Sequence, residues 1–214
     1  MINNLADRTA SNARARAVVF DVGGVLLRTD DHGPRRKLAE SMGLTEAQLH
    51  DAVFESPLAR SATLGTVREE ALWADVARRF NRDASQMAAF QAGFWGGDVY
   101  DVDFMAWIGA LRPKVSTGLL SNAWSGARET FVNRFECYRY VDSVVISAEE
   151  GVAKPDPEIY RICLRRMGVA AEETVFVDDF ARNVDAAIRL GMRGILFTSR
   201  EQAMAEIEAA LSGK

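Results

Sequence analysis

Three short apolar stretches, far apart in this chain, each end abruptly in polar residues. They are Val18 to Phe20 before Asp21, Gly118 to Leu120 before Ser121 and Asn122, and Val175 to Val177 before Asp178 and Asp179. Short apolar, β-branched runs bounded by turn signals are typical of buried strands. In an open α/β sheet, ligands bind in the crevice outside the carboxyl ends of the strands. We therefore expect a carboxylate, a hydroxyl and a carboxylate pair to meet at one edge of a sheet.

The order of the expected elements favours an α/β fold. Strands are expected at Ala17 to Phe20, Val115 to Leu120, Ser143 to Ile146, Thr174 to Val177 and Gly194 to Phe197. Helical periodicity follows at Pro157 to Met167, with Asp156 as N-cap and Gly168 as its end, and at Ala181 to Leu190, stopped by Gly191. Strands that alternate with helices predict a Rossmann-like, doubly wound, mostly parallel sheet.

Between residues 28 and 97 the pattern changes to helices without convincing strands. The expected helices are Gly33 to Met42, Thr45 to Phe54, Val67 to Phe80 and Ala84 to Phe94. A structureless connection of this length is implausible in a compact domain, so we expect an inserted α-helical cap. The core domain then comprises residues 17–27 and 98–214, the cap comprises residues 28–97, and hinges lie near residues 28–33 and 96–97. The polar residues 1–16 are expected to form a disordered leader.

Composition and charge narrow the range of partners. A hydrophobic fraction of 48% and a charged fraction of 26% are ordinary for a soluble globular protein. The net charge of −4 argues against nucleic acid or an anionic membrane as the main partner, and no apolar run approaches the length of a membrane span. Cys137 and Cys163 suggest neither a disulfide framework nor a zinc site. We expect a cytoplasmic protein with no nucleic-acid or membrane partner, either a monomer or a homodimer.

The carboxylates at the strand ends point to phosphoryl chemistry. Asp21 at the end of a strand can attack phosphorus and form an aspartyl-phosphate, and Gly23 and Gly24 let the backbone turn tightly beneath a ligand. Asp178 and Asp179 repel each other unless a cation or protons intervene, so the pair implies a metal. Each motif read alone also fits a turn or a helix cap. Their occurrence together favours the functional reading.

Two further segments would complete a phosphate site. The Ser121 hydroxyl and the backbone amides near Asn122 suit phosphoryl oxygens, although a Ser-Asn pair after a strand is also a common turn. Lys154 precedes Pro155, which restricts the lysine backbone to extended conformations, although a lone lysine is usually solvated. Trp124 is expected to be a core residue.

The order Asp, Ser, Lys, Asp-Asp resembles the haloacid dehalogenase-like (HAD) hydrolase superfamily, from about Ala17 to Ser199. The run Lys-Pro-Asp-Pro-Glu-Ile-Tyr from Lys154 to Tyr160 is the most specific match. The resemblance implies the strand order 5-4-1-2-3 with the Asp21 strand in the centre. It also implies a Mg²⁺-dependent phosphatase that hydrolyses a small phosphorylated metabolite through an aspartyl-phosphate.

The resemblance assigns a role to each candidate residue. Asp21 is the expected nucleophile, and Lys154 neutralises the phosphate and steadies that nucleophile. The other expected phosphate contacts are Ser121, Asn122, Gly23 and Gly24. The expected ligands of Mg²⁺ are Asp21, the backbone carbonyl of Gly23, Asp178 and Asp179. Asn183 is expected to orient a carboxylate across one helical turn.

One position departs from the phosphatase pattern. These phosphatases usually carry a second Asp two residues after the nucleophile, which protonates the leaving group and then activates water, but this chain has Gly23 there. Losing a positioned acid–base group typically costs about 10²- to 10⁴-fold in rate. The sequence is therefore similar to the Asp-x-Gly-Gly-Val-Leu subgroup of subfamily IA, which includes sugar-phosphate phosphatases and resembles the N-terminal part of epoxide hydrolases.

Two alternative functions stay open. One is a 2-haloacid dehalogenase, in which Asp21 attacks carbon and no metal is needed. The pair Asp178 and Asp179 argues against it, because uncompensated carboxylates repel a carboxylate substrate. The other is a weakly active or regulatory protein that has kept the phosphate pocket, which Gly23 alone supports.

Overall fold

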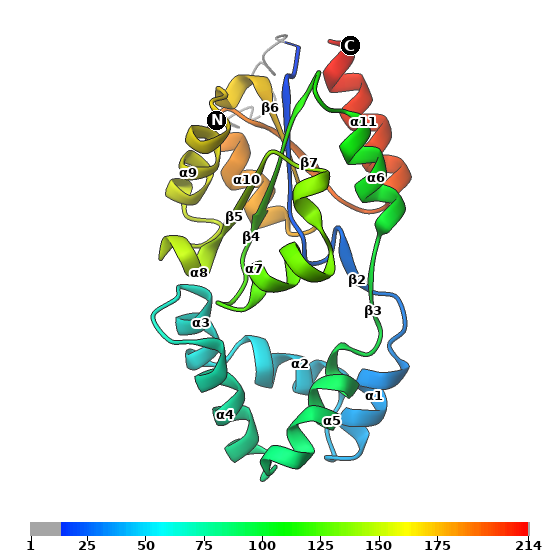
Figure 1. The fold of residues 1–214 in the computed structure, drawn as a ribbon, viewed down its shortest axis with the longest axis vertical. Helices are drawn as coiled ribbons and strands as arrows, with labels where there is room; N and C mark the ends of the chain where they lie inside the picture. The colour runs from blue at the N-terminus through cyan, green and yellow to red at the C-terminus, as the bar shows by residue number, and fades with distance from the viewer. Residues whose placement is uncertain (1–13, 214) are drawn as a thin grey trace, which may run out of the picture.

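A five-stranded parallel sheet forms one body of the computed structural model, which describes residues 14–213, and a group of helices forms the other (Figure 1). The strands of the sheet are β1 (Ala17–Phe20), β4 (Ser116–Ser121), β5 (Ser143–Ile146), β6 (Thr174–Asp178) and β7 (Arg193–Leu196). They lie in the order β5-β4-β1-β6-β7, and every neighbouring pair is parallel. Because β1 is central, Asp21 emerges at the middle of the carboxyl edge.

The expected doubly wound sheet is confirmed. If the five strands are numbered 1 to 5 along the chain, their order across the sheet, from β7 to β5, is 5-4-1-2-3. Their labels differ from that count because two further strands, β2 (Leu27–Thr29) and β3 (Asp98–Tyr100), pair antiparallel in a separate ribbon. The sequence analysis did not predict this ribbon. Each of its strands has only three residues, too few for an alternating pattern.

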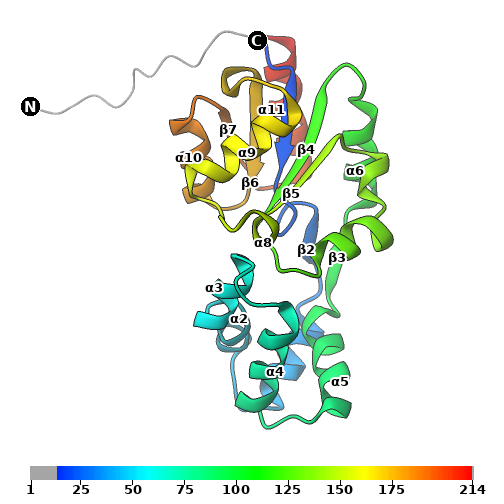
Figure 2. The ribbon, with the colours of Figure 1, turned by 60° about the vertical axis from the view of Figure 1, so that its left-hand side comes forward.

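Helices cover both faces of the sheet (Figures 1 and 2). Val18 and Phe20 of β1 pack with α6 (Val102–Ala110) and α11 (Arg200–Ser212), two helices that were not among those expected. Val19 packs on the opposite face with α9 (Pro157–Met167) and α10 (Ala181–Arg189). This alternation is the two-residue period of a strand that is buried on both faces.

The local signals of α9 are confirmed residue for residue. The Asp156 side chain accepts a hydrogen bond from the Glu158 N–H (2.8 Å), and Gly168 ends the helix with φ 65°. Shorter elements complete the core: α7 (Ala127–Glu129), α8 (Ser147–Glu150), a π-helical turn at Thr130–Arg134 and 3₁₀ turns at Cys137–Arg139 and Ala171–Glu173. No helix in residues 14–213 is long and apolar enough to cross a membrane.

Five helices lie between β2 and β3, and we refer to them as the helical group. They are α1 (Gly33–Glu40), α2 (Glu46–Phe54), α3 (Pro57–Thr63), α4 (Glu69–Arg79) and α5 (Ala84–Trp95). They enclose a hydrophobic cluster that includes Leu49, Leu72 and Phe94 and that Trp124, from the loop after β4, completes. The helices expected from periodicity are present, whereas α3 was not expected. The division into core and cap at residues 28 and 97 stays a prediction. Arg28, the expected first residue of the cap, lies in β2.

The expected leader covered residues 1–16, of which residues 1–13 lie outside the described part of the chain. For residues 14–16 the prediction of a separate leader is wrong. Ala15 is buried and its N–H donates to Ala210 O (3.1 Å), while the Arg16 N–H donates to Glu173 O (2.8 Å). The chain therefore joins the core before residue 17.

The two connections between the helical group and the sheet run side by side. Beyond the β2–β3 ribbon, the N–H groups of Asp30 and Asp31 both donate to Gly97 O (3.1 and 3.3 Å). Arg35 of α1 is buried and donates to the Asp98 carboxylate at 3.0 Å. The two expected hinge segments, near residues 28–33 and 96–97, therefore lie side by side and are hydrogen-bonded to each other. We refer to this pair of connections as the double link.

This close crossing predicts a large effect of a small substitution. A Cβ at Gly97 would lie 1.7 Å from the backbone oxygen of Asp31, so the two connecting segments would have to move apart. We expect Gly97→Ala to lower the free energy of unfolding by about 1–3 kcal/mol, the usual cost of overpacking. Gly93→Ala in α5 is the control, because its Cβ would meet only the Leu38 side chain at 3.4 Å and Ala is favoured over Gly in a helix. Urea unfolding should separate the two variants; equal stabilities would contradict the crossing.

Candidate active site

A buried lysine lies between two carboxylates at the carboxyl edge of the sheet. Lys154 is 4% exposed, and its Nζ lies 2.8 Å from Asp21 Oδ1 and 2.7 Å from Asp178 Oδ2. Asp21 follows β1 and Asp178 ends β6, its parallel neighbour, so the strand pairing sets the two carboxylates side by side. Breaking such a buried arrangement by removing one partner typically costs about 3–5 kcal/mol. Lys154, Asp21 and Asp178 therefore stabilise one another, and the loss of any one of them leaves a buried charge without its partner.

Asn122 fixes the backbone that carries this lysine. Its Nδ2 donates to Lys154 O (2.9 Å), and its Oδ1 accepts from the Lys154 N–H (2.8 Å). Asn122 follows Ser121, the buried last residue of β4, which lies beside β1. Asn122 was expected to contact the phosphate, whereas both polar atoms of its side chain bond to the backbone of Lys154. Any contact of Asn122 with a phosphate would therefore come from its backbone.

Asn183 and the turn after β6 orient Asp178. The Asn183 Nδ2 donates to both carboxylate oxygens of Asp178 (3.0 and 3.1 Å), and the Phe180 N–H donates to Oδ1 (2.8 Å). The Tyr160 hydroxyl donates to Asn183 O (2.9 Å) and so supports the start of α10. Asn183 was expected to orient a carboxylate, and the structure identifies Asp178. Tyr160 ends the quoted lysine motif, but no sequence signal linked its hydroxyl to Asn183.

Three carboxylates are placed to hold a cation. Asp21, Asp178 and Asp179 each offer an oxygen, and these oxygens lie within 4.8 Å of one another. Asp179 Oδ1 is buried and has no hydrogen-bond partner among the described residues. A Cβ at Gly24 would fall 2.1 Å from Asp179 Oδ2, so this glycine makes room for the carboxylate. A buried, unpaired oxygen in an all-carboxylate set fits a hard divalent cation such as Mg²⁺.

Burial makes this cluster electrostatically costly without a cation. Burial raises the pKa of Asp21 to about 7, Lys154 opposes that shift, and the charge of Asp178 adds to it. Burial and the charge of Asp178 also raise the pKa of Asp179 to about 6. One lysine thus faces three carboxylates, and a bound cation favours their ionised forms.

The position that lacks the acid–base Asp is sterically open. A Cβ at Gly23 would meet no heavy atom of the described residues within 4 Å, and its φ lies outside the left-handed region. The backbone here closes a tight turn, in which the Gly24 N–H donates to Leu27 O (2.9 Å). The structure therefore leaves space for a side chain at Gly23. The expected roles of Gly23 and Gly24 toward phosphate and metal stay predictions.

All candidate residues lie at one edge of the sheet, as the strand ends predicted. Lys154, Asp178 and Asp179 lie around Asp21. Asn122 bonds to the backbone of Lys154, and Asn183 bonds to the carboxylate of Asp178. Two further contacts were not expected from the sequence. The Val22 N–H donates to Asp21 Oδ1 (2.6 Å), and Ser147 bonds to both backbone groups of Ala123 in the loop after β4. The catalytic roles themselves stay predictions.

Comparison with known proteins gives matches along most of the chain. A family model of haloacid dehalogenase-like hydrolases matches residues 15–191. The D-ribitol-5-phosphate phosphatase of Bacteroides thetaiotaomicron is 26% identical over 186 residues, which cover 81% of this chain and 87% of that protein. Mouse acyl-CoA dehydrogenase family member 10 is 41% identical over 70 residues, or 33% of this chain and 6% of that protein.

A solved structure extends the likeness to the fold. A mutant of a HAD family enzyme from Bacteroides thetaiotaomicron, in complex with magnesium and inorganic phosphate, matches with a TM-score of 0.72. It is 20% identical, and the match covers 86% of this chain and 94% of that one. At this identity the likeness concerns the fold alone. The chain spans between 6% and 36% of the length of several curated relatives that it matches.

The raised pKa of Asp21 predicts how stability depends on pH in the metal-free protein. The folded state keeps a proton on Asp21 that the unfolded state loses, so this group destabilises the protein as pH rises from about 4 to about 7. Asp21→Asn removes the titration. In excess chelator we expect its stability relative to the wild type to increase by about 1–3 kcal/mol between about pH 5 and about pH 8. Thermal unfolding at the two pH values measures this, and a constant difference would contradict the shift.

Proposed function

The chain belongs to the haloacid dehalogenase-like hydrolase family, and we propose that it is a Mg²⁺-dependent phosphatase that hydrolyses a small phosphorylated metabolite through Asp21. The observation that carries the proposal is Lys154, buried between Asp21 and Asp178 beside a further carboxylate, Asp179. The D-ribitol-5-phosphate phosphatase is similar to this chain over most of both sequences, which supports a small phosphorylated substrate.

Asp21 supplies the nucleophile. Its Oδ1 accepts from the Val22 N–H and from Lys154 Nζ, which leaves Oδ2 for attack on phosphorus. A bond forms between Oδ2 and phosphorus as the bond to the leaving oxygen breaks, and the leaving oxygen takes up a proton from water. Water then attacks the aspartyl-phosphate, which releases inorganic phosphate and restores the Asp21 carboxylate.

The other residues handle charge. Lys154 neutralises the transferred phosphoryl group, and the Ser121 hydroxyl at the end of β4 donates to one of its oxygens. Asp21, Asp178 and Asp179 would hold Mg²⁺, which when bound offsets the negative charge of the carboxylates and of the phosphate. Asn183 keeps Asp178 in place for this purpose.

The two alternatives account for less of the structure. A 2-haloacid dehalogenase needs no cation, and the unpaired buried oxygen of Asp179 would repel its carboxylate substrate. A non-catalytic role rests on Gly23 alone, while Lys154 and Asp178 stay fully assembled around Asp21. The phosphatase explains both the surplus of carboxylates and the lysine.

Replacing the nucleophile should abolish activity without unfolding the protein. We expect Asp21→Asn to reduce Mg²⁺-dependent phosphate release from p-nitrophenyl phosphate to background, because the amide is a poor nucleophile and a poor metal ligand. Asp185→Asn removes an exposed carboxylate from α10 and is the matched control. Full activity of Asp21→Asn, or of the wild type in excess chelator, would contradict the mechanism. Chloride release from a chloro-acid without Mg²⁺ would favour the dehalogenase instead.

The missing acid–base carboxylate predicts a dependence on the leaving group. Turnover of the wild type should rise steeply as the pKa of the leaving alcohol falls, because no side chain at Gly23 protonates it. Gly23→Asp fits the open space and should speed alkyl phosphates by up to about 10²- to 10⁴-fold. Gly23→Ala is the control, since it adds a Cβ but no acid. A flat leaving-group series in the wild type would show that another group already supplies the proton.

A further inference from the structure

Glu69, the first residue of α4, joins the helical group to the loop that follows β4. Its N–H donates to Ser125 Oγ (3.1 Å), and its Oε2 accepts from the Gly126 N–H (3.1 Å). Its second oxygen, Oε1, accepts from Trp73 Nε1 within α4 (2.9 Å). One half-buried residue thus makes two hydrogen bonds across the boundary, while Trp73 holds its carboxylate in place.

The loop that Glu69 contacts begins in the candidate active site. Ser125 and Gly126 follow Asn122, whose side chain holds the backbone of Lys154. Between them, the Ala123 N–H donates to Ser147 Oγ and the same hydroxyl donates to Ala123 O. An unbroken series of contacts therefore leads from α4 to the lysine beside Asp21.

Trp124, in the same loop, adds an apolar contact with the helical group. It is 8% exposed and belongs to a hydrophobic cluster whose other members all come from the helical group or the turns between its helices. Its ring centroid lies 5.3 Å from that of Phe54 and 5.8 Å from that of Trp73. Trp124 was expected to be a core residue, and it is buried under the helical group rather than beneath the sheet.

A second contact lies close to the first. A Cβ at Gly65, in the turn after α3, would fall 1.9 Å from the backbone oxygen of Ala148 in α8. Figures 1 and 2 both show α3 directly below α8. The helical group is thus attached through the double link on one side and docked against α8 and the loop after β4 on the other.

We propose that Glu69 is a latch that holds the helical group against the core and so positions the loop from Ser121 to Gly126 at the phosphate site. Glu69 touches no reacting atom and acts through Ser125 and Gly126, which makes it a positioning residue. When the latch opens, the helical group turns away about the double link, and Trp124 is uncovered. The latch itself is tested without any substrate, and only its effect on turnover rests on the proposed function.

The test without substrate follows the exposure of Trp124. The chain contains four tryptophans, so 5-fluorotryptophan labelling gives four ¹⁹F resonances, and the spectrum of Trp124→Phe assigns the relevant one. We expect Glu69→Ala to increase the broadening of the Trp124 resonance by a soluble gadolinium chelate. The resonance of Trp107, which lies in α6 of the core, should be unchanged and shows that the core is intact.

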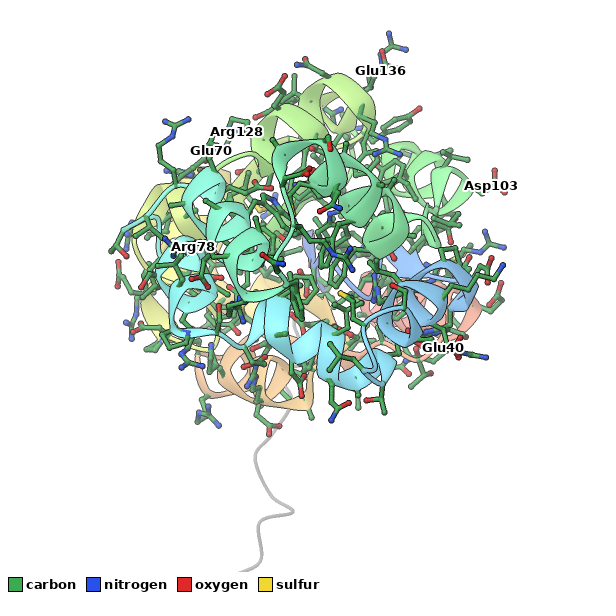
Figure 3. The ribbon with its side chains drawn as sticks, turned by 90° about the horizontal axis from the view of Figure 1, so that it is seen from below. Glu40, Glu70, Arg78, Asp103, Arg128 and Glu136 are labelled. Carbon is green, nitrogen blue, oxygen red and sulfur yellow. The ribbon has the colours of Figure 1, made fainter. Side chains whose placement is uncertain are left out.

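A second variant opens the latch from the core side. A Cβ at Gly126 would lie 2.6 Å from Glu69 Oε2, and its φ of −81° accommodates alanine, so Gly126→Ala displaces the carboxylate while every residue of the helical group stays unsubstituted. It should expose Trp124 as Glu69→Ala does. Glu70→Ala is the matched control, because Glu70 is the next residue, lies exposed at the surface (Figure 3) and pairs with Arg68 rather than with the core. Unchanged protection of Trp124 in both latch variants, or equal exposure in Glu70→Ala, would overturn the proposal.

Turnover tests the positioning role. With Mg²⁺ and p-nitrophenyl phosphate, Glu69→Ala and Gly126→Ala should lower kcat/KM by about 10- to 100-fold, the cost of a slightly misplaced group, with kcat reduced as well as KM raised. Glu69→Gln keeps one acceptor oxygen and should fall between. An active wild type whose latch variants keep its kcat/KM would overturn the positioning role. An inactive wild type with an exposed Trp124 in the variants would refute the phosphatase and leave the latch standing.

Discussion

The site depends on one buried interaction, the contact of Lys154 with Asp21 and Asp178. Burying an ion costs several kcal/mol, and the cost is recovered only where geometry and further hydrogen bonds are good. Here the lysine meets both carboxylates below 3 Å, and Asn183 supports Asp178. Asp21 and Asp178 lie more than 150 residues apart in the sequence, and the parallel sheet brings the ends of their two strands together, while Lys154 reaches them from the turn before α9.

The carboxylates around Lys154 outnumber the positive charges, and this excess of negative charge suits the proposed phosphoryl transfer with a bound cation. Lys154 and the N–H groups of Val22 and Phe180 compensate Asp21 and Asp178 in part, whereas Asp179 keeps a buried oxygen without a partner among residues 14–213. A phosphate would add further negative charge. In the proposed mechanism a divalent cation would offset this charge. Burial first, and then the charge of Asp178, raise the pKa values of Asp21 and Asp179 in the metal-free protein.

Local signals predicted a large part of the fold and of the site, and contacts between distant segments account for the rest. The strand Ala17–Phe20 and the helix Pro157–Met167 were predicted to the residue, because an apolar run with a polar end and the caps Asp156 and Gly168 are written in consecutive residues. The ribbon of β2 and β3 was not, since its strands pair across some seventy residues. Glu69 also could not be distinguished from its neighbour Glu70 in sequence, because only the folded chain brings Gly126 to one of them.

Trapping the covalent intermediate tests the central claim most directly. The wild type is mixed with Mg²⁺ and an aryl phosphate, quenched in acid within the first turnovers, digested and analysed by peptide mass spectrometry. Because no carboxylate at Gly23 activates water, we expect phosphate to accumulate on the peptide that contains Asp21, and to be absent in excess chelator. Phosphate release in the first turnover with the phosphoryl group on another residue, or with an unmodified Asp21 throughout, would contradict the account.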